Sequence, residues 1–150
     1  AGTGTSIDVH LGGKQDDLYS SPAIVTADVV AIGGGEIMAH CIGMESFNAG
    51  RAVLLRIGSI QIVVSETEGI GGNHPAVYRH FGIEPGTAKM IVLKTASNFQ
   101  YFADLASEII RVNTAGMTMS NLAEFDWQQL PRPIYPLDPE TSFLNGRKSI

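Results

Sequence analysis

The chain has 150 residues, enough for one domain with a hydrophobic core, and its 44% hydrophobic and 17% charged residues exclude a disordered protein. A formal net charge of −5 without a basic stripe argues against a surface for nucleic acid or anionic lipid, because both need clustered Lys and Arg. No apolar run approaches the length needed to cross a bilayer, which argues against a membrane-spanning protein.

The first half of the sequence predicts antiparallel strands. Residues 5–11 alternate between apolar and polar side chains, which is the two-residue period of a half-buried strand. After a polar loop, the Val- and Ile-rich residues 23–32 predict a long strand. Because Gly33-Gly34-Gly35 tolerates positive φ, we expect a turn there, followed by a strand over residues 36–42 that completes a hairpin.

A second hairpin is predicted over residues 52–57 and 60–64, on either side of Gly58-Ser59. Gly at the first central position of a two-residue loop is typical of a type II′ turn. Both strands are apolar at nearly every position, so we expect this hairpin in the centre of the sheet.

The second half predicts strand–helix units, which gives an α/β (α+β) fold with a mixed sheet for the whole chain. Pro75 suits the first turn of a helix over residues 75–81, with His74 or Asn73 near the cap and Gly82 at the end. The further elements predicted are a strand over 90–93, a helix over 99–106, a strand over 109–112 and a short helical turn over 121–125.

The end of the chain predicts no regular structure. From Pro131 the sequence has four prolines in nine residues, and proline removes a backbone donor and breaks helices and strands. We expect an extended segment there, with residues 139–150 as a C-terminal tail.

The polar residues after the strand predicted over 90–93 are the best-placed candidates for a ligand site. In α/β units ligands gather at the carboxyl ends of strands, where loop amides and the next helix N-terminus converge. We therefore expect Lys94, Thr95, Ser97 and Asn98 to bind a substrate. The alternative is that Ser97 or Asn98 only caps the next helix and that Lys94 is solvated, and the sequence leaves both open.

The Gly-rich loop over residues 65–73 is a second candidate, since long loops of this kind often close over ligands. It combines carboxylates, glycines and a neighbouring imidazole, so Glu68 and His74 are added to the predicted substrate-binding residues. The alternative is that its carboxylates are ordinary solvated charges.

Catalytic and metal-binding residues are not predicted within this chain. The four histidines have no recognised ligand spacing, and the sequence has no nucleophile–base pair. The single Cys41 excludes an internal disulfide framework and a Cys-based zinc site. One cysteine fits a reducing compartment, so we expect a cytoplasmic protein.

Five segments occur in an order that is specific when taken together: Leu11-Gly12-Gly13-Lys14, Gly50-Arg51-Ala52-Val53-Leu54, Phe81-Gly82-Ile83-Glu84-Pro85, Val92-Leu93-Lys94-Thr95-Ala96-Ser97-Asn98-Phe99 and Arg132-Pro133-Ile134-Tyr135-Pro136-Leu137-Asp138. In this order they resemble the C-terminal domain of MlrC-like proteins, the microcystinase C-type zinc metallopeptidases. The resemblance covers nearly the whole chain, so we expect residues 1–138 to form this domain.

The resemblance implies that the zinc ion and the hydrolytic centre lie in a larger N-terminal domain of the intact protein, and that this chain is a fragment without the metal. It implies an accessory domain that completes the substrate cleft or an oligomer interface and is inactive alone. The expected partners are that N-terminal catalytic domain and a further copy of the chain. The start at Ala1-Gly2-Thr3-Gly4, without Met, fits a piece of a longer protein.

The residues that the resemblance carries over are Lys94, Thr95, Ser97 and Asn98. Two departures, the sequence of the loop over 68–74 and Asn98 where the family commonly has His, argue against a microcystin-type peptide substrate. The alternative function is a stand-alone small-molecule-binding or assembly module without catalysis.

Overall fold

The protein is described here by a computed structural model, which covers residues 2–14, 18–41, 43–67, 73–95, 97–114, 121–139 and 141. The chain falls into two compact units, Ala1–Ile110 and Arg111–Ile150, and each is described by itself. Glu68, one of the predicted binding residues, and most of the predicted tail over 139–150 lie outside the described residues.

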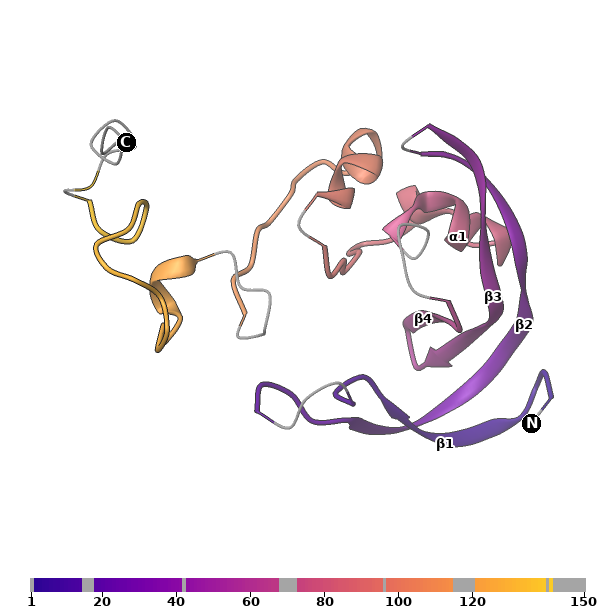
Figure 1. Ribbon diagram of the computed structural model, residues 1–150. Coiled ribbons are helices and arrows are strands. Elements are labelled where there is room, and N and C mark those ends of the chain that lie inside the picture. The colour runs from indigo at the N-terminus through magenta and orange to yellow at the C-terminus, as the bar shows by residue number, and fades with distance from the viewer. Residues whose placement is uncertain are drawn as a thin grey trace. The chain divides into compact units, whose positions relative to one another are not determined.

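The first unit is built on a four-stranded antiparallel sheet of β1 (Ser6–Leu11), β2 (Ala23–Cys41), β3 (Met44–Ile57) and β4 (Ile60–Ser65), in the order β1-β2-β3-β4 (Figure 1). Every strand pairing among the described residues is antiparallel. With the helices that follow, this confirms an α+β fold whose first half consists of antiparallel hairpins.

The hairpin predicted around Gly33-Gly34-Gly35 is wrong. β2 runs through these glycines as one 19-residue strand, and its turn lies between Cys41 and Met44, where Gly43 has φ 74°. The pairing with β3 shifts between Gly34 and Glu36. The glycines therefore permit an irregular, bending strand rather than a reversal, because a residue without Cβ relieves the crowding at a bulge.

The hairpin predicted around Gly58-Ser59 is confirmed, with Ile57 paired to Ile60 and Gly58 at φ 58°. Its predicted place in the centre of the sheet is correct only for β3. β4 has one strand neighbour among the described residues, and its Ile60 keeps 60% of its surface exposed. A continuous apolar sequence therefore did not distinguish an inner strand from an edge strand.

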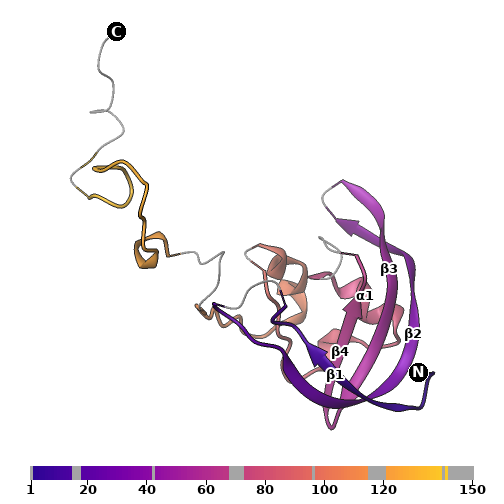
Figure 2. The ribbon, with the colours of Figure 1, turned by 60° about the horizontal axis from the view of Figure 1, so that its bottom comes forward.

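The core of this unit lies on the concave side of the sheet. One cluster joins Ala27, Val29 and Leu55 of β2 and β3 with apolar residues of β1 and β4. A second cluster joins Ile37, in the C-terminal half of β2, and Ala49, in the N-terminal half of β3, to Val77 of the helix that follows the sheet. Figures 1 and 2 show β2 and β3 curving together around that helix, α1.

The helix predicted over 75–81 is confirmed as α1 (Pro75–His80). Gly82 ends it with φ 75°, and the Ile83 amide donates to the Tyr78 carbonyl at 3.0 Å while the Gly82 amide donates to the Arg79 carbonyl at 2.9 Å. These two bonds are those of a Schellman motif, in which a left-handed glycine satisfies the last helical carbonyls.

Glu84 explains the rest of the segment Phe81-Gly82-Ile83-Glu84-Pro85. Its carboxylate accepts two hydrogen bonds from the Arg79 guanidinium, at 2.8 and 2.9 Å, and one from the Gly86 amide. The first contact ties the segment back to α1, and the second caps the short 3-10 helix η2 (Pro85–Thr87). The segment thus links α1 to the chain that follows.

Two predicted strands are wrong. Residues 90–93 and 109–112 pair with no strand among the described residues and have no regular secondary structure. Between them, the helix predicted over 99–106 is present as a 3-10 helix, η3 (Asn98–Leu105). A strand exists only with a neighbour, and the described part of the chain offers none to these two runs.

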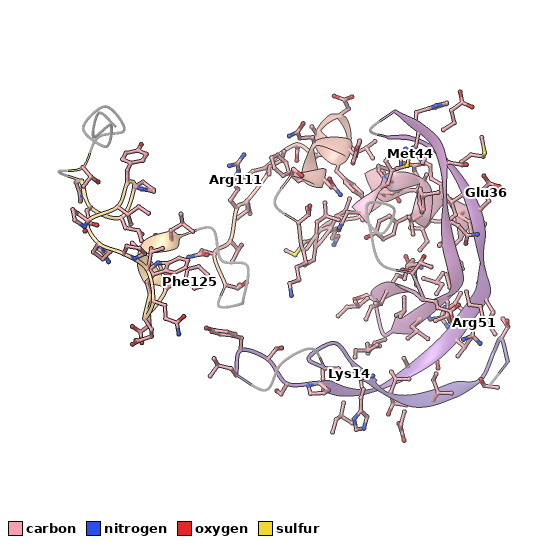
Figure 3. The ribbon with its side chains drawn as sticks, in the orientation of Figure 1. Lys14, Glu36, Met44, Arg51, Arg111 and Phe125 are labelled. Atoms are coloured by element: carbon pink, nitrogen blue, oxygen red, sulfur yellow. The ribbon has the colours of Figure 1, made fainter. Side chains whose placement is uncertain are left out.

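The second unit has little regular structure. Its one short helix among the described residues is η4 (Leu122–Glu124), within the turn predicted over 121–125. Asn121 caps it by accepting from the Ala123 amide at 3.2 Å, and the Trp127 indole donates to the Leu122 carbonyl at 2.7 Å. Figure 3 labels Phe125, whose ring lies 5.3 Å from that of Trp127.

The segment Arg132-Pro133-Ile134-Tyr135-Pro136-Leu137-Asp138 is irregular, as predicted, but it is closed by an ion pair. The Asp138 carboxylate accepts from the Arg132 guanidinium and from the Ile134 amide, and this holds the pKa of Asp138 down at about 2. Arg132 and Asp138, at the two ends of this segment, are therefore in contact. No helix in the described part of the chain is long and apolar enough to cross a membrane.

Candidate functional site

His74 is the predicted binding residue that the fold places most firmly. It precedes α1, and its Nδ1 atom accepts a hydrogen bond from the Ala76 amide at 3.1 Å. Its ring also contacts the ring of Tyr101 in η3, with centroids 4.8 Å apart. His74 thus connects the start of α1 to η3, the helix that begins at the predicted binding residue Asn98.

Partial burial and the nearby Arg79 charge lower the pKa of His74 below its usual value. Both effects disfavour a second positive charge at this place. The neutral ring is also the form that the cap needs, because a protonated Nδ1 has no lone pair for the Ala76 amide. His74 is therefore held as an acceptor at the N-terminus of α1.

A second aromatic contact fixes η3 on α1. Tyr78 of α1 meets Phe102 of η3 edge-on, with centroids 6.0 Å apart, and Phe102 is buried. Burial raises the pKa of Tyr78. The two helices are joined by rings at two positions, so the residues at the start of η3 have a defined place relative to His74.

Thr95, Ser97 and Asn98 are tied to one another at the start of η3. The Thr95 hydroxyl oxygen accepts from the Asn98 amide at 3.0 Å and from the Ser97 amide at 3.4 Å, while the Ser97 hydroxyl donates to Asn98 Oδ1 at 3.3 Å. Thr95 is therefore the side chain that caps η3, and Ser97 makes no cap bond of its own. Substrate binding by these residues stays a prediction.

Lys94 is the charged member of the group. Its side chain is exposed, and no hydrogen bond or ion pair joins it to another residue that the structure describes. A solvated ammonium next to a hydrogen-bonded cap is available to an anionic or carbonyl group. The geometry thus permits the binding role that the sequence predicts for Lys94.

The sequence analysis missed the pair of Arg51 and Glu66. The Arg51 guanidinium donates to both carboxylate oxygens of Glu66, at 2.8 and 3.1 Å, and the Arg51 amide donates to the same carboxylate at 3.0 Å. These bonds hold the pKa of Glu66 at about 2. The pair fixes the point where the Gly-rich loop leaves β4, and Figure 3 labels Arg51 on β3.

A shallow hollow of about 350 Å³ lies beside this pair, and Ile7, Val29 and Val64 are among its apolar lining residues. The charges at its rim, Arg51 and Glu66, already satisfy each other. The hollow therefore offers a ligand mainly apolar contact.

A zinc site does not form from the residues that the structure describes, because no three His, Cys, Asp or Glu side chains gather there. Zinc in proteins needs three or four converging ligands of these types. The described side chains therefore do not fit the zinc ion, which the family resemblance places in an N-terminal domain.

Comparison with known proteins identifies the family. The pattern that defines the family described as MlrC C-terminus matches residues 1–129. The chain belongs to this family. The predicted resemblance to this family is therefore confirmed, and four of the five sequence segments lie within the match, while the segment over 132–138 lies outside it.

A solved structure shows the same fold as this MlrC C-terminal domain. It is the crystal structure titled "Putative metallopeptidase" from Mesorhizobium sp. BNC1, with a TM-score of 0.72 and 24% identity over 92% of this chain. The match covers only 28% of that protein, so the chain spans little more than a quarter of its length. The comparison with curated proteins finds no match.

Proposed function

We propose that this domain is the C-terminal accessory part of a zinc-dependent hydrolase of amide bonds, in which it completes the substrate cleft and is inactive alone. The observation that supports this proposal is the family of the chain together with its length relative to a longer protein of the same fold. The chain is an MlrC C-terminal domain, and it corresponds to 28% of a protein whose structure is titled "Putative metallopeptidase". In this proposal the metal-activated water belongs to the larger, preceding part of the intact protein.

Lys94 is the residue that we propose for substrate contact. Its ammonium is exposed at the start of a segment that Thr95 caps and that aromatic contacts fix on α1. A cation held at a cleft binds a substrate carboxylate or carbonyl through a charge-assisted hydrogen bond, which contributes about 1.5–3 kcal/mol. Thr95, Ser97 and Asn98 act in this proposal by fixing the backbone next to that cation.

The test uses the intact protein and this chain side by side on a panel of amide substrates. We expect hydrolysis by the intact protein and none by the chain. In the intact protein, Lys94→Ala should lower kcat/KM by about ten- to a hundredfold, the effect of losing one charge-assisted hydrogen bond. Lys89→Ala, which removes an exposed charge at the other end of the same segment, is the matched control.

The melting temperature separates a binding role from a structural one. Both Lys variants should melt within about 1 °C of the unchanged protein, because surface substitutions usually change stability little. A large loss of thermal stability in Lys94→Ala would assign that residue a structural role. Turnover by the isolated chain would contradict the proposed function.

A further inference from the structure

Residues 89–95 have the side-chain pattern of a strand without being one. Met90 and Val92 are exposed, at 77% and 82% of their surface, while Ile91 and Leu93 between them are half-buried. This alternation has the period of two residues that a strand produces when one face packs and the other points outward. Nothing in the described part of the chain covers these two large apolar side chains on the outer face.

The backbone of the same segment is equally unpaired. Within the described part of the chain, no backbone hydrogen bond is made by residues 89–95, and the sheet order contains no strand there. An apolar, β-branched run with free amides and carbonyls is a template for pairing with another strand. Residues 89–95 therefore have the sequence of a strand but lack the backbone hydrogen bonds of one.

A second apolar run follows η3, and its side chains are exposed rather than alternating. Ile109 and Ile110 are exposed, Ile110 at 73%, and residues 108–110 make no backbone hydrogen bond to the described residues. The connection over residues 94–108 contains η3 and is longer than the dozen residues that a crossover between parallel strands requires. The order of run, helix and run is that of a strand–helix–strand unit.

We propose that residues 90–93 form a strand in the intact protein by adding to the edge of a parallel sheet in the part that precedes this domain. This inference rests on the proposed function, which supplies that preceding part. The docked strand places Lys94 at its carboxyl end, which is where parallel sheets bind their ligands. Main-chain hydrogen bonds hold the strand, and apolar contacts with Met90 and Val92 set its register.

The charges at the ends of the segment argue against a second copy as its occupant. An antiparallel pair that matches all four apolar residues places Lys89 opposite Lys94 at both ends. A parallel pair in register places each lysine beside its own copy. Like charges directly opposite each other destabilise paired strands. The expected partner is thus a different strand that is apolar in its middle and carries no Lys or Arg opposite the two lysines.

Hydrogen exchange of the intact protein tests the docking directly. A strand that adds to a sheet edge pairs on one side only, so we expect every second amide of residues 90–94 to exchange at least about a hundredfold more slowly in the intact protein than in this chain. Equal, fast exchange in both proteins overturns the proposal. Self-association of the chain that protects the same amides also overturns it, because the occupant is then a second copy.

A matched pair of variants locates the contact. Val92→Asp in the intact protein should abolish the protection of residues 90–94, whereas Ile24→Asp should not. Ile24 is exposed to a similar extent, at 71%, but its strand β2 is already paired with β1 at His10. Retained protection in Val92→Asp, or equal loss in both variants, overturns the proposal.

The exchange experiment does not depend on turnover, so the two proposals fail separately. Slow exchange in an intact protein that hydrolyses no amide supports the docking and contradicts the function. Hydrolysis with fast exchange at residues 90–94 supports the function and overturns the docking.

Discussion

His74 shows how much one residue of this chain does through its local bonds. It caps α1 with a neutral Nδ1 atom, and its ring contacts the ring of Tyr101 in η3. The cap was predictable because the sequence places a polar residue directly before Pro75, a favoured first helical residue. The contact with Tyr101 was not, since it joins residues 27 positions apart (101 − 74 = 27) across an irregular connection.

The lowered pKa of His74 predicts a loss of stability in acid. A group whose pKa is lower in the folded protein stabilises it above the usual value of 6.5, and this contribution is lost as the pH falls through the lowered value. Urea unfolding at pH 7.5 and pH values below 6.5 should therefore show a pH slope that His74→Asn removes, because Asn keeps a cap acceptor and does not titrate.

His74→Ala is the matched control, since it removes both the cap and the titration. At pH 7.5 it should lower the free energy of unfolding by about 1 kcal/mol, the usual cost of losing a cap. An unchanged pH slope in both variants would assign the acid sensitivity to another group.

The ion pair between Arg51 and Glu66 could have been predicted from the sequence. The hairpin around Gly58-Ser59 pairs Ala52 with Ser65, so extending its register by one residue brings Arg51 opposite Glu66. Opposite charges at facing positions attract. The missing step was to carry the predicted register past the last apolar residue into the loop, where the pattern of hydrophobicity no longer marks a strand.

At the scale of elements, what the sequence predicted correctly is what local chemistry decides. The turn at Gly58-Ser59, the first turn of α1 at Pro75 and its end at Gly82 each depend on residues within a few positions. The strands predicted over 90–93 and 109–112 depend on a neighbouring strand instead, and sequence pattern cannot say whether the neighbour is present.

The prediction of a turn at Gly33-Gly34-Gly35 was wrong for a related reason. A run of glycines is compatible both with a chain reversal and with a bend inside a strand. Gly34 has φ 118°, and a Cβ atom there would lie 2.1 Å from the Gly50 carbonyl oxygen. Gly35 has φ 77° with nothing within 4 Å of its Cβ position. A side chain at Gly35 would therefore cause backbone strain alone, whereas a side chain at Gly34 would also collide with β3.

This difference predicts unequal costs of two alanine substitutions. Gly35→Ala should lower the free energy of unfolding by about 1–2 kcal/mol, the cost of a left-handed L-residue. Gly34→Ala should cost at least about 2 kcal/mol more, because β2 and β3 must also move apart to admit the methyl group. Guanidinium unfolding midpoints compare them, and equal midpoints would contradict the close approach.

At the scale of the whole molecule, the domain combines a well-packed curved sheet with apolar runs that the sheet does not cover. The sheet residues Ala27, Leu54 and Leu55 are almost completely buried, whereas Met90 and Val92 are among the most exposed apolar side chains described. Soluble proteins rarely leave such runs uncovered unless another surface meets them. The fold class could be predicted from the sequence because it depends on the buried residues of the sheet. The candidate site could not, because it depends on exposed residues whose contacts lie outside the sheet.

The same contrast predicts how the isolated chain behaves near its isoelectric point of about 5.2. At pH 7 the formal charge of −5 keeps copies apart, and this repulsion vanishes as the pH approaches 5.2, which leaves the uncovered runs free to associate. Solubility should therefore fall steeply between these two values.

Val92→Asp and Ile24→Asp add the same charge, so a shift of the isoelectric point affects both alike. We expect Val92→Asp to remain clearly more soluble than Ile24→Asp at the isoelectric point of each variant, because it also breaks an unpaired apolar run. Equal solubility of the two variants, measured by light scattering across this range, would show that residues 90–93 are not the surface through which the chain associates.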